Sequence, residues 1–171
     1  MKKADINILM NEDIWNLIGK QWMLITSGTK DIFNSMTASW GGVGWLWNKP
    51  VVFVFIRPER YTHQFVEKNE YFTLSFFSEE YRKALQLLGT ISGRDCNKVE
   101  IAGVTPYIVS EQHVTFSESR MTLICRKLFK TPMTKDAFIE DSILSQWYNS
   151  NPGGSLHDIY IAEISELWLN E

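Results

Sequence analysis

An unbroken run of six apolar residues, Val51 to Ile56, sets the strongest constraint on the fold. The run has no polar alternation, so it predicts a strand that is buried on both faces. Pro50 comes directly before it, after a turn at Asn48 and Lys49, and proline is tolerated as the first residue of a strand. A strand of this kind must sit inside a sheet that is covered on both sides.

Further strands are expected at regular intervals along the chain, at residues 22–26, 33–40, 71–77, 108–116, 120–129 and 158–169. The first two flank a turn at residues 27–31 and predict one hairpin. The segments 108–116 and 120–129 flank Ser117 to Ser119 and predict a second hairpin.

Helices are fewer, and the sequence predicts them at residues 13–20, 62–68, 79–88 and 139–148. Thr62 is expected to be the N-cap of the second helix, and Ser78 the N-cap of the third, which Gly89 is expected to end. A turn at residues 149–154 should end the last helix. Because helices do not follow each strand, a parallel sheet is disfavoured, and the chain predicts a mainly β fold, a β-barrel with peripheral helices. With 171 residues and no internal repeat, a single domain over residues 1–171 is expected.

Composition excludes several classes of function. The formal net charge is −3, whereas a nucleic-acid partner would require a basic surface. We find no apolar run of about 18 residues that would span a membrane, and the N-terminus lacks the apolar core of a signal peptide. We therefore expect a cytoplasmic protein. Cys96 and Cys125 form no CxxC motif and are expected to be free thiols.

The residues before the apolar run are small or hydroxylated: Met36, Thr37, Ala38 and Ser39 precede Trp40 and three glycines within the next four positions. Small side chains let a flat ligand approach the backbone closely, and backbone N–H groups can then bond to a ring system. We hypothesise that this stretch holds a flavin nucleotide. An ordinary transition from strand to loop explains the same residues.

The polar turn after the run carries cations. Arg57, Tyr61 and Thr62 would form a phosphate site if the start of the predicted helix faced them, although a solvated charged turn is an equal alternative. A second polar loop, residues 92–98, contains Ser92, Gly93, Arg94 and Lys98, and could wall the same anion site or lie at the surface.

The sequence has no motif for a metal site, for a dinucleotide or P-loop site, or for a serine nucleophile. The histidines His63, His113 and His157 have no metal-ligand spacing, and the chain has no GxGxxG, P-loop or GxSxG motif. We therefore expect no metal site, and acid–base catalysis has no obvious candidate residues.

Taken in order, the segments MTASW, VVFVFIRPERYT, EKNEYFTLSFF and LGTISGRDCNKVE resemble the flavin reductase-like family, in particular its flavoredoxin-type branch. The resemblance extends from about residue 22 to residue 164. It implies the FMN-binding split-barrel fold, a six-stranded Greek-key barrel, and a homodimer with one FMN near each subunit contact.

The resemblance also assigns roles. It implies that residues 36–40 edge the flavin ring, and that a second set binds the phosphate: Arg57, Tyr61, Thr62, Ser92, Gly93, Arg94 and Lys98. Trp147 or Tyr148 would cover the ring, although no motif supports this. Family members often have a Gly-His pair before the last strand; here His157 stands without the glycine, which leaves its role open.

The function expected from the resemblance is an FMN-dependent oxidoreductase. NADH or NADPH would be the electron donor, and a small molecule or a protein the acceptor; FMN carries the chemistry, so no catalytic side chain is required. Two alternatives remain: a barrel that binds FMN without turnover, as a carrier or redox sensor, and an interaction module without a cofactor.

Overall fold

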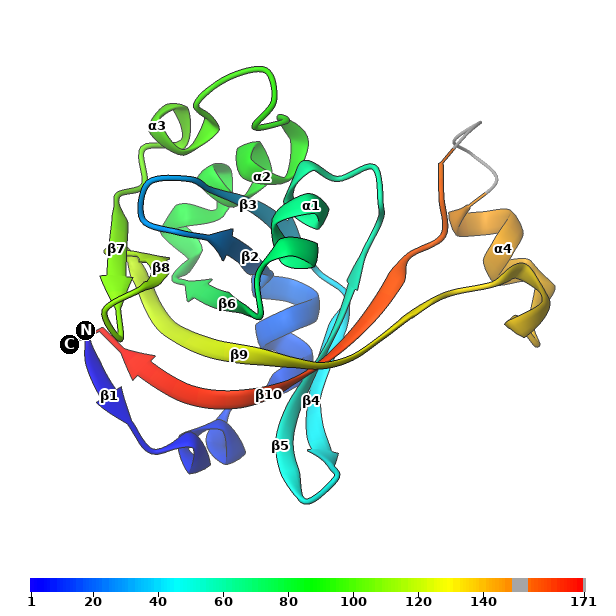
Figure 1. Ribbon diagram of the computed structural model, residues 1–171, viewed down its shortest axis with the longest axis horizontal. Helices are drawn as coiled ribbons and strands as arrows, with labels where there is room; N and C mark the ends of the chain where they lie inside the picture. Colours follow the sequence, from blue (N-terminus) through cyan, green and yellow to red (C-terminus); the bar gives the residue numbers. More distant parts are fainter. Residues whose placement is uncertain (149–153, 171) are drawn as a thin grey trace.

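The fold is built on an antiparallel sheet that curves into a split barrel (Figure 1). It is taken from a computed structural model, which describes residues 1–148 and 154–170. The strands are Lys2–Ala4 (β1), Met23–Gly28 (β2), Phe33–Ala38 (β3), Gly41–Leu46 (β4), Lys49–Ile56 (β5), Tyr71–Phe77 (β6), Pro106–Val109 (β7), His113–Phe116 (β8), Ser119–Pro132 (β9) and Asp158–Leu169 (β10). Eight of these strands form the sheet, in the order β3-β2-β6-β9-β10-β5-β4, with β1 paired to β10; β7 and β8 pair separately.

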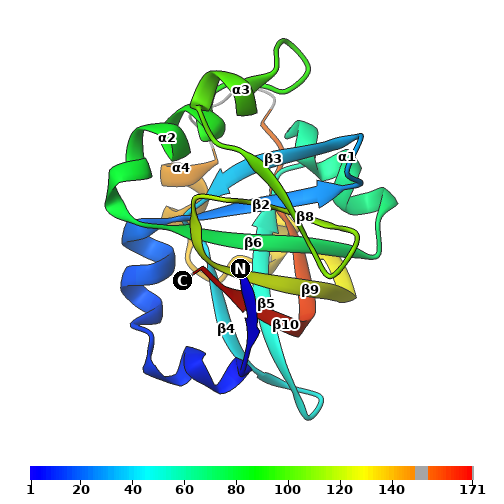
Figure 2. The ribbon, with the colours of Figure 1, turned by 90° about the vertical axis from the view of Figure 1, so that its left-hand side faces the viewer.

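The helices lie around this sheet, as the two views show (Figure 1 and Figure 2). They are Ile6–Asn11 (η1), Trp15–Gln21 (η2), Tyr61–Lys68 (α1), Glu79–Tyr81 (η3), Arg82–Thr90 (α2), Lys98–Ala102 (α3), Lys135–Ala137 (η4) and Asp141–Trp147 (α4). The predicted mainly β barrel with peripheral helices is confirmed.

The barrel is split between its two terminal strands. Among the described residues β3 pairs only with β2, β4 pairs only with β5, and no ladder joins β3 to β4. The chain crosses from one strand to the other through just two residues, Ser39 and Trp40. The stretch that the sequence singled out for ligand binding, Met36 to Trp40, is therefore the end of β3 and the bridge across the opening of the barrel.

The apolar run Val51 to Ile56 forms most of β5, next to β10. Its residues Val52, Val54 and Ile56 are fully buried in the main core cluster, with Tyr160 of β10. Val51 is also fully buried, although its side chain leaves the strand on the other face, whereas Phe53 and Phe55 are partly exposed. Burial on both faces is thus confirmed for the valines but incomplete for the phenylalanines.

β9 and β10 extend beyond the barrel as a long pair, drawn in yellow and red, and carry α4 at the end of an arm (Figure 1). In the register of β10 on β5, Asp158 opposes Ile56. The preceding residue His157 therefore lies opposite Arg57, at the base of the arm.

Several local predictions were wrong. The glycine-rich segment Gly41–Leu46 is a strand, β4, that the sequence did not predict. The segments 108–116 and 120–129 do not pair as a hairpin, because β8 pairs with β7 while β9 pairs with β6 and β10. Gly89 does not end α2, which continues to Thr90.

Helix starts also differ from expectation. Arg60 is the N-cap of α1, so Thr62 lies inside the helix, where its hydroxyl accepts a hydrogen bond from the side chain of Asn34. Ser78 precedes η3 but makes no capping hydrogen bond with its side chain. The expected helix at 13–20 is a π-helix, η2. Residues 149–153 of the last predicted turn lie outside the described residues.

Candidate functional site

Two adjoining cavities occupy the opening of the barrel. The first, of 240 Å³, is lined by Met36, Thr37, Ala38, Ser39, Trp40, Phe55, Arg57, Arg60, Gly89 and His157. The second, of 180 Å³, is lined by Asn34, Met36, Glu59, Arg60, Tyr61, Thr62, Thr90, Ile91, Ser92, Arg94 and Lys98. Met36 and Arg60 line both, so the cavities adjoin; we call them the ring cavity and the anion corner.

The wall of the ring cavity is the free edge of β3. Because β3 is a terminal strand, the backbone groups on its outer edge have no ladder partner and are available to a ligand. The side chains beside them are small. Thr37 turns its hydroxyl away to donate to the carbonyl of Leu85 in α2, at 2.5 Å. This edge therefore offers backbone hydrogen-bonding groups to a flat molecule.

The close approach of α2 to β3 depends on Gly89. A Cβ at this position would lie 3.1 Å from the Cβ of Thr37, closer than most such contacts. The glycine thus lets the end of α2 reach the cavity. Its carbonyl oxygen accepts a hydrogen bond from Nη2 of Arg60 at 2.7 Å, which fixes that guanidinium between the two cavities.

The anion corner gathers three cations. Besides Arg60, it contains Lys98, which is buried and donates to the carbonyls of Leu88 and Ile91 at 2.9 and 3.1 Å. The guanidinium of Arg94 lies 4.8 Å from the centre of the Tyr61 ring. Burial lowers the pKa of Lys98 to about 8, with a smaller contribution from Arg60, so the amine is still largely protonated at pH 7.

Helix α1 begins in the same corner. Its N-cap residue, Arg60, makes no side-chain hydrogen bond to the first turn. Unsatisfied N–H groups at a helix start favour an anion. Together with the three cations, they make this corner suitable for a phosphate group.

The other end of the ring cavity is covered by aromatic residues from the arm. Trp40 makes an edge-to-face contact with Trp147 of α4, with ring centres 5.3 Å apart, and its ring is also 5.3 Å from His157. Arg57 donates to the backbone carbonyl of Trp147 at 3.0 Å, and its guanidinium lies 5.1 Å from the ring centre of Tyr148. The arm is thereby fixed over the cavity mouth.

His157 is held neutral at this mouth. Burial, and secondarily the positive charge of Arg57, lower its pKa to about 4. Its Nδ1 lies 2.8 Å from the hydroxyl of Tyr148. When that hydroxyl donates to Nδ1, the neutral imidazole carries its proton on Nε2 and has one donor left for a ligand.

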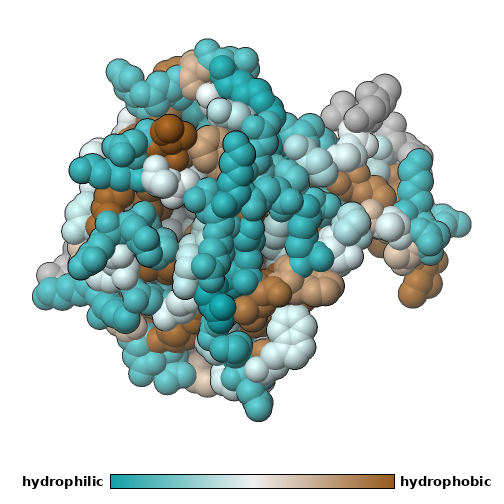
Figure 3. All heavy atoms as spheres, in the orientation of Figure 1, coloured by the Kyte–Doolittle hydropathy of each residue, from teal (hydrophilic) through white to brown (hydrophobic). Residues whose placement is uncertain are grey.

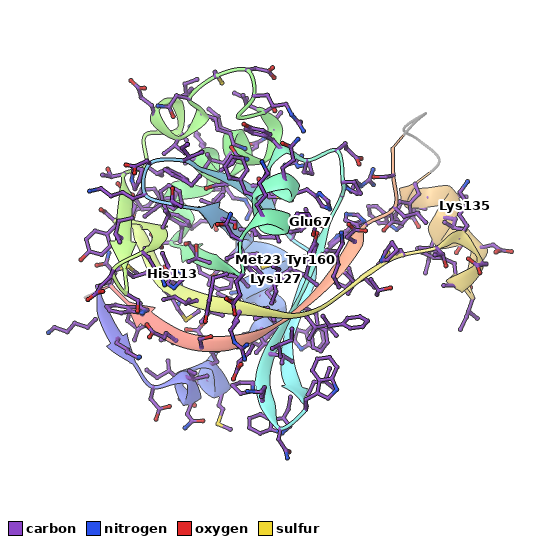
Figure 4. The ribbon with its side chains drawn as sticks, in the orientation of Figure 1. Met23, Glu67, His113, Lys127, Lys135 and Tyr160 are labelled. Carbon is purple, nitrogen blue, oxygen red and sulfur yellow. The ribbon has the colours of Figure 1, made fainter. Side chains whose placement is uncertain are left out.

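Behind the cavity, a polar network ties the arm to α1. Asp158, next to His157, accepts from His63 and pairs with Lys130, at 2.8 and 3.0 Å. Lys130 also pairs with Glu67, which accepts from the hydroxyl of Tyr160 at 2.6 Å; Figure 4 shows Glu67 beside Tyr160. The helix that starts in the anion corner and the strand that carries His157 therefore share one set of contacts.

The two cavities account for all the predicted site residues except Gly93. This glycine packs behind the corner: a Cβ there would lie 2.1 Å from Oδ1 of Asn34. Ser39 and Arg57, which lie on either side of the apolar run, both line the ring cavity. Arg57 was expected in the phosphate site, but it does not line the anion corner, because its guanidinium is held by the carbonyl of Trp147.

Sequence reasoning missed Arg60, Phe55, Gly89 and Asn34 as lining residues. Arg60 was detectable from its spacing, three positions after Arg57 in the same turn. The position of Asn34 depends on contacts distant in sequence, which no local pattern indicates.

Comparison with known proteins agrees with this geometry. The model of the flavin reductase like domain matches residues 15–171. A search of curated proteins gave no match. The fold is similar to that of flavoredoxin from Methanosarcina acetivorans (TM-score 0.68, 16% identity, 88% of this chain and 69% of that one). It is equally similar to an FMN-binding domain of a flavin reductases-like enzyme from Shewanella baltica OS155 (TM-score 0.68, 16% identity, 98% and 76%).

A third similar structure is nitrilotriacetate monooxygenase component B from Bacillus cereus (TM-score 0.66, 17% identity, 100% of this chain and 82% of that one). At these identities the structures establish the fold, and the domain match, which covers most of the sequence, establishes the family. None of the helices described in the structure is long and apolar enough to span a membrane. The chain belongs to the flavin reductase-like family and has its split-barrel fold.

Proposed function

We propose that the protein is an FMN-dependent oxidoreductase that takes electrons from NADH or NADPH and passes them to a second substrate. One observation carries this proposal: a cavity edged by free strand backbone adjoins a corner with Arg60, Arg94 and Lys98. A flat ring with an anionic tail fits that combination. The names of similar proteins, which include flavoredoxin and FMN-binding domains, support it.

Each part of the site has a role in this proposal. The corner cations and the start of α1 bind the phosphate. The outer edge of β3 donates to the polar edge of the ring and orients it. Trp40 and Trp147 limit the access of water to the cavity mouth. Bound FMN supplies hydride acceptance and donation, which no side chain of this protein can supply.

His157 completes the mouth as an uncharged donor. At pH 7 it adds no positive charge beside the ring, because its pKa is about 4. Its Nε2 proton is then available for a hydrogen bond to a substrate or to the ring. Arg57 is the cation nearest this position, and it is placed to attract the phosphates of a nicotinamide donor.

The test is direct. Purified protein mixed with FMN should retain it through gel filtration and show a flavin absorption spectrum. Oxidation of NADH or NADPH by this complex, well above a blank of free FMN, supports an enzyme. Retention of FMN without such oxidation supports instead a carrier or redox sensor. A protein that retains no FMN and shows no thermal shift with it contradicts both functions.

We also propose that the protein forms a homodimer. An aromatic surface, formed by Trp45, Trp47 and Phe129, lies where the β4–β5 hairpin meets the arm, and its side chains are 69%, 55% and 44% exposed. Trp47 and Phe129 are in contact, with ring centres 6.3 Å apart. Figure 3 shows pale and brown residues gathered below the base of the arm. Exposed apolar surface of this kind favours a partner.

We place the protein in the cytoplasm as part of this proposal. Cys96 and Cys125 are both free thiols, and free thiols suit a reducing compartment.

A further inference from the structure

A separate groove lies on the other side of Trp40. It is formed between the segment Glu12–Gly19, which includes most of η2, and the segment Ser39–Val43 at the start of β4; we call it the N-terminal groove. Figure 2 shows η2, the blue helix, standing beside β4. Its volume is 690 Å³, larger than either cavity of the flavin site, and within the usual range for small-molecule sites.

The groove borders the ring cavity. Ser39 and Trp40 line both, so this two-residue bridge is the wall that separates them. A molecule bound in the groove would lie one side chain away from the proposed flavin.

The lining is mainly apolar and aromatic. Ile14, Ile18 and Val43 provide aliphatic surface, and the rings of Trp15 and Trp40 lie at the rim. Trp15 is 88% exposed, although burial of its ring would be strongly favourable. Such a lining suits a flat ring system.

The charge of the groove is opposite to that of the flavin site. Its charged lining residues are Glu12 and Asp13, and among the residues that the structure describes no lysine, arginine or histidine lines it. Arg120 donates to both carboxylate oxygens of Glu12 at 3.0 Å, which neutralises that residue. Asp13 accepts from the backbone N–H of Asn16 but makes no ion pair in the described part of the chain. A phosphate or carboxylate ligand is therefore disfavoured here.

Glycines keep the groove open. A Cβ on Gly19 would meet no atom within 4 Å, so the space in front of it is empty. On the opposite wall, Gly41 leaves bare backbone, since a Cβ there would point into β5, 2.6 Å from the carbonyl oxygen of Phe53. Gly19 belongs to a π-helix seven residues long, a rare conformation that occurs often at functional sites.

We propose that the N-terminal groove binds a planar aromatic small molecule that carries no negative charge. The binding site stands independently of the flavin. Its role as the site of a second substrate rests on the proposed function: an uncharged quinone would take two electrons across the Ser39–Trp40 bridge, together with two protons, and become the hydroquinone. The nicotinamide donor would supply the two electrons and one of the protons as it is oxidised, and solvent the other proton.

The test uses menadione, an uncharged naphthoquinone, and its anionic analogue 1,4-naphthoquinone-2-sulfonate. Binding is measured by calorimetry on full-length protein with FMN in saturating amount, so that the ring cavity is filled. Wild type should bind menadione at least tenfold more tightly than the sulfonate. Gly19→Leu fills the groove and should weaken menadione binding at least tenfold, whereas the matched control Gly19→Ala should bind it like wild type.

Trp15→Ala is the second variant, since this exposed ring can be removed without disturbing the core; it should weaken menadione binding severalfold. A titration with FMN alone should give the same affinity for all these proteins. The proposal is wrong if Gly19→Leu binds menadione like wild type, or if Gly19→Leu changes the sedimentation coefficient, which would make the groove a subunit contact. Failure of every protein to bind FMN would contradict the proposed function but not the groove, because Gly19 lines only the groove, and the comparison of Gly19→Leu with Gly19→Ala still reports on binding there.

Discussion

Arg60 and Lys98 converge on the same helix end. Each donates to backbone carbonyls at the C-terminus of α2, Arg60 from the N-cap of α1 and Lys98 from the first turn of α3. The partial negative charge of that helix end stabilises two cations that would otherwise repel each other. The corner is thus assembled as a cationic site before any ligand arrives.

The first prediction concerns the pH dependence of FMN binding. The pKa of Lys98 is lowered to about 8, and a bound phosphate would raise it. The affinity for FMN should therefore be highest below pH 8. It should decrease as the pH rises from about 8, the pKa of Lys98 in the free protein, to the higher pKa of Lys98 in the complex. Lys98→Arg should make affinity nearly independent of pH between 7.5 and 10, as fluorescence titration would show. Identical pH profiles for the two proteins would exclude Lys98 from the phosphate site.

Arg60 should distinguish FMN from riboflavin. Arg60→Gln removes a charge-assisted hydrogen bond, worth roughly 1.5–3 kcal/mol, and should weaken FMN binding about 10–100-fold. Riboflavin lacks the phosphate, so its affinity should change much less. Arg126→Gln, a half-exposed arginine that pairs with Glu163 away from both cavities, is the matched control and should leave both affinities as in wild type. Equal losses for both flavins would show that Arg60 supports the ring cavity instead.

His157 should make stability depend on pH. Its pKa of about 4 in the folded protein is below the ordinary value near 6.5. Between these values the unfolded chain binds a proton that the folded chain does not, so stability should decrease as the pH falls from 6.5 to 4. In urea unfolding, the free energy of unfolding of His157→Gln should decrease over this pH range by about 1–3 kcal/mol less than that of wild type. A variant with the wild-type slope would mean that other groups dominate this pH range.

Gly93 and Asn34 form a pair suited to a double-mutant cycle. Gly93→Ala places a Cβ against Oδ1 of Asn34, whose amide donates to Thr62 at 2.7 Å inside the protein. Displacement of that buried amide should cost about 1–3 kcal/mol of unfolding free energy. In an Asn34→Ala background the clash is absent, so the same change at Gly93 should cost much less. Additive losses would indicate that the clash is relieved elsewhere.

The proposed dimer depends on the aromatic surface. Replacement of Trp47 and Phe129 by serine, at side chains more than 40% exposed, should leave the fold intact and shift the protein toward monomer in sedimentation velocity. Ile32→Ser is the control, since this exposed side chain lies on the β2–β3 turn, outside that surface. A wild-type protein that is monomeric at micromolar concentration would contradict the proposal outright.

Strands that are rich in apolar and aromatic residues could be predicted from the sequence. The ranges 71–77 and 158–169 agree with β6 and β10, and the run Val51 to Ile56 is the body of β5. β4 escaped prediction because its three glycines have low intrinsic strand propensity, and pairing with β5 determines its conformation. The pairing of β9 with β6 could not be predicted from local sequence, since β6 lies some 50 residues earlier in the chain.

The site was predictable where chemistry and order in the sequence coincide. Ser39 and Arg57 line one cavity, as their places in one connected stretch favour, but Arg57 was expected beside the phosphate and lies instead in the ring cavity, outside the anion corner. The arm contacts of Trp147 with Trp40 follow from how β9 and β10 pair, and no residue pattern near Trp147 encodes them. The π-helix was missed because its apolar spacing resembles that of an α-helix over so few residues.

The unbroken course of β9 and β10 has a mechanical consequence. Both strands are anchored in the core and leave it as a single ladder, which shifts register between Ile161 and Ala162 and again between Ile164 and Glu166. The arm is accordingly held by the sheet at one end and by the contacts of Trp147 with Trp40 and Arg57 at the other. Because Trp147 in α4 touches Trp40, any displacement of α4 would be felt first by a residue that lines the ring cavity.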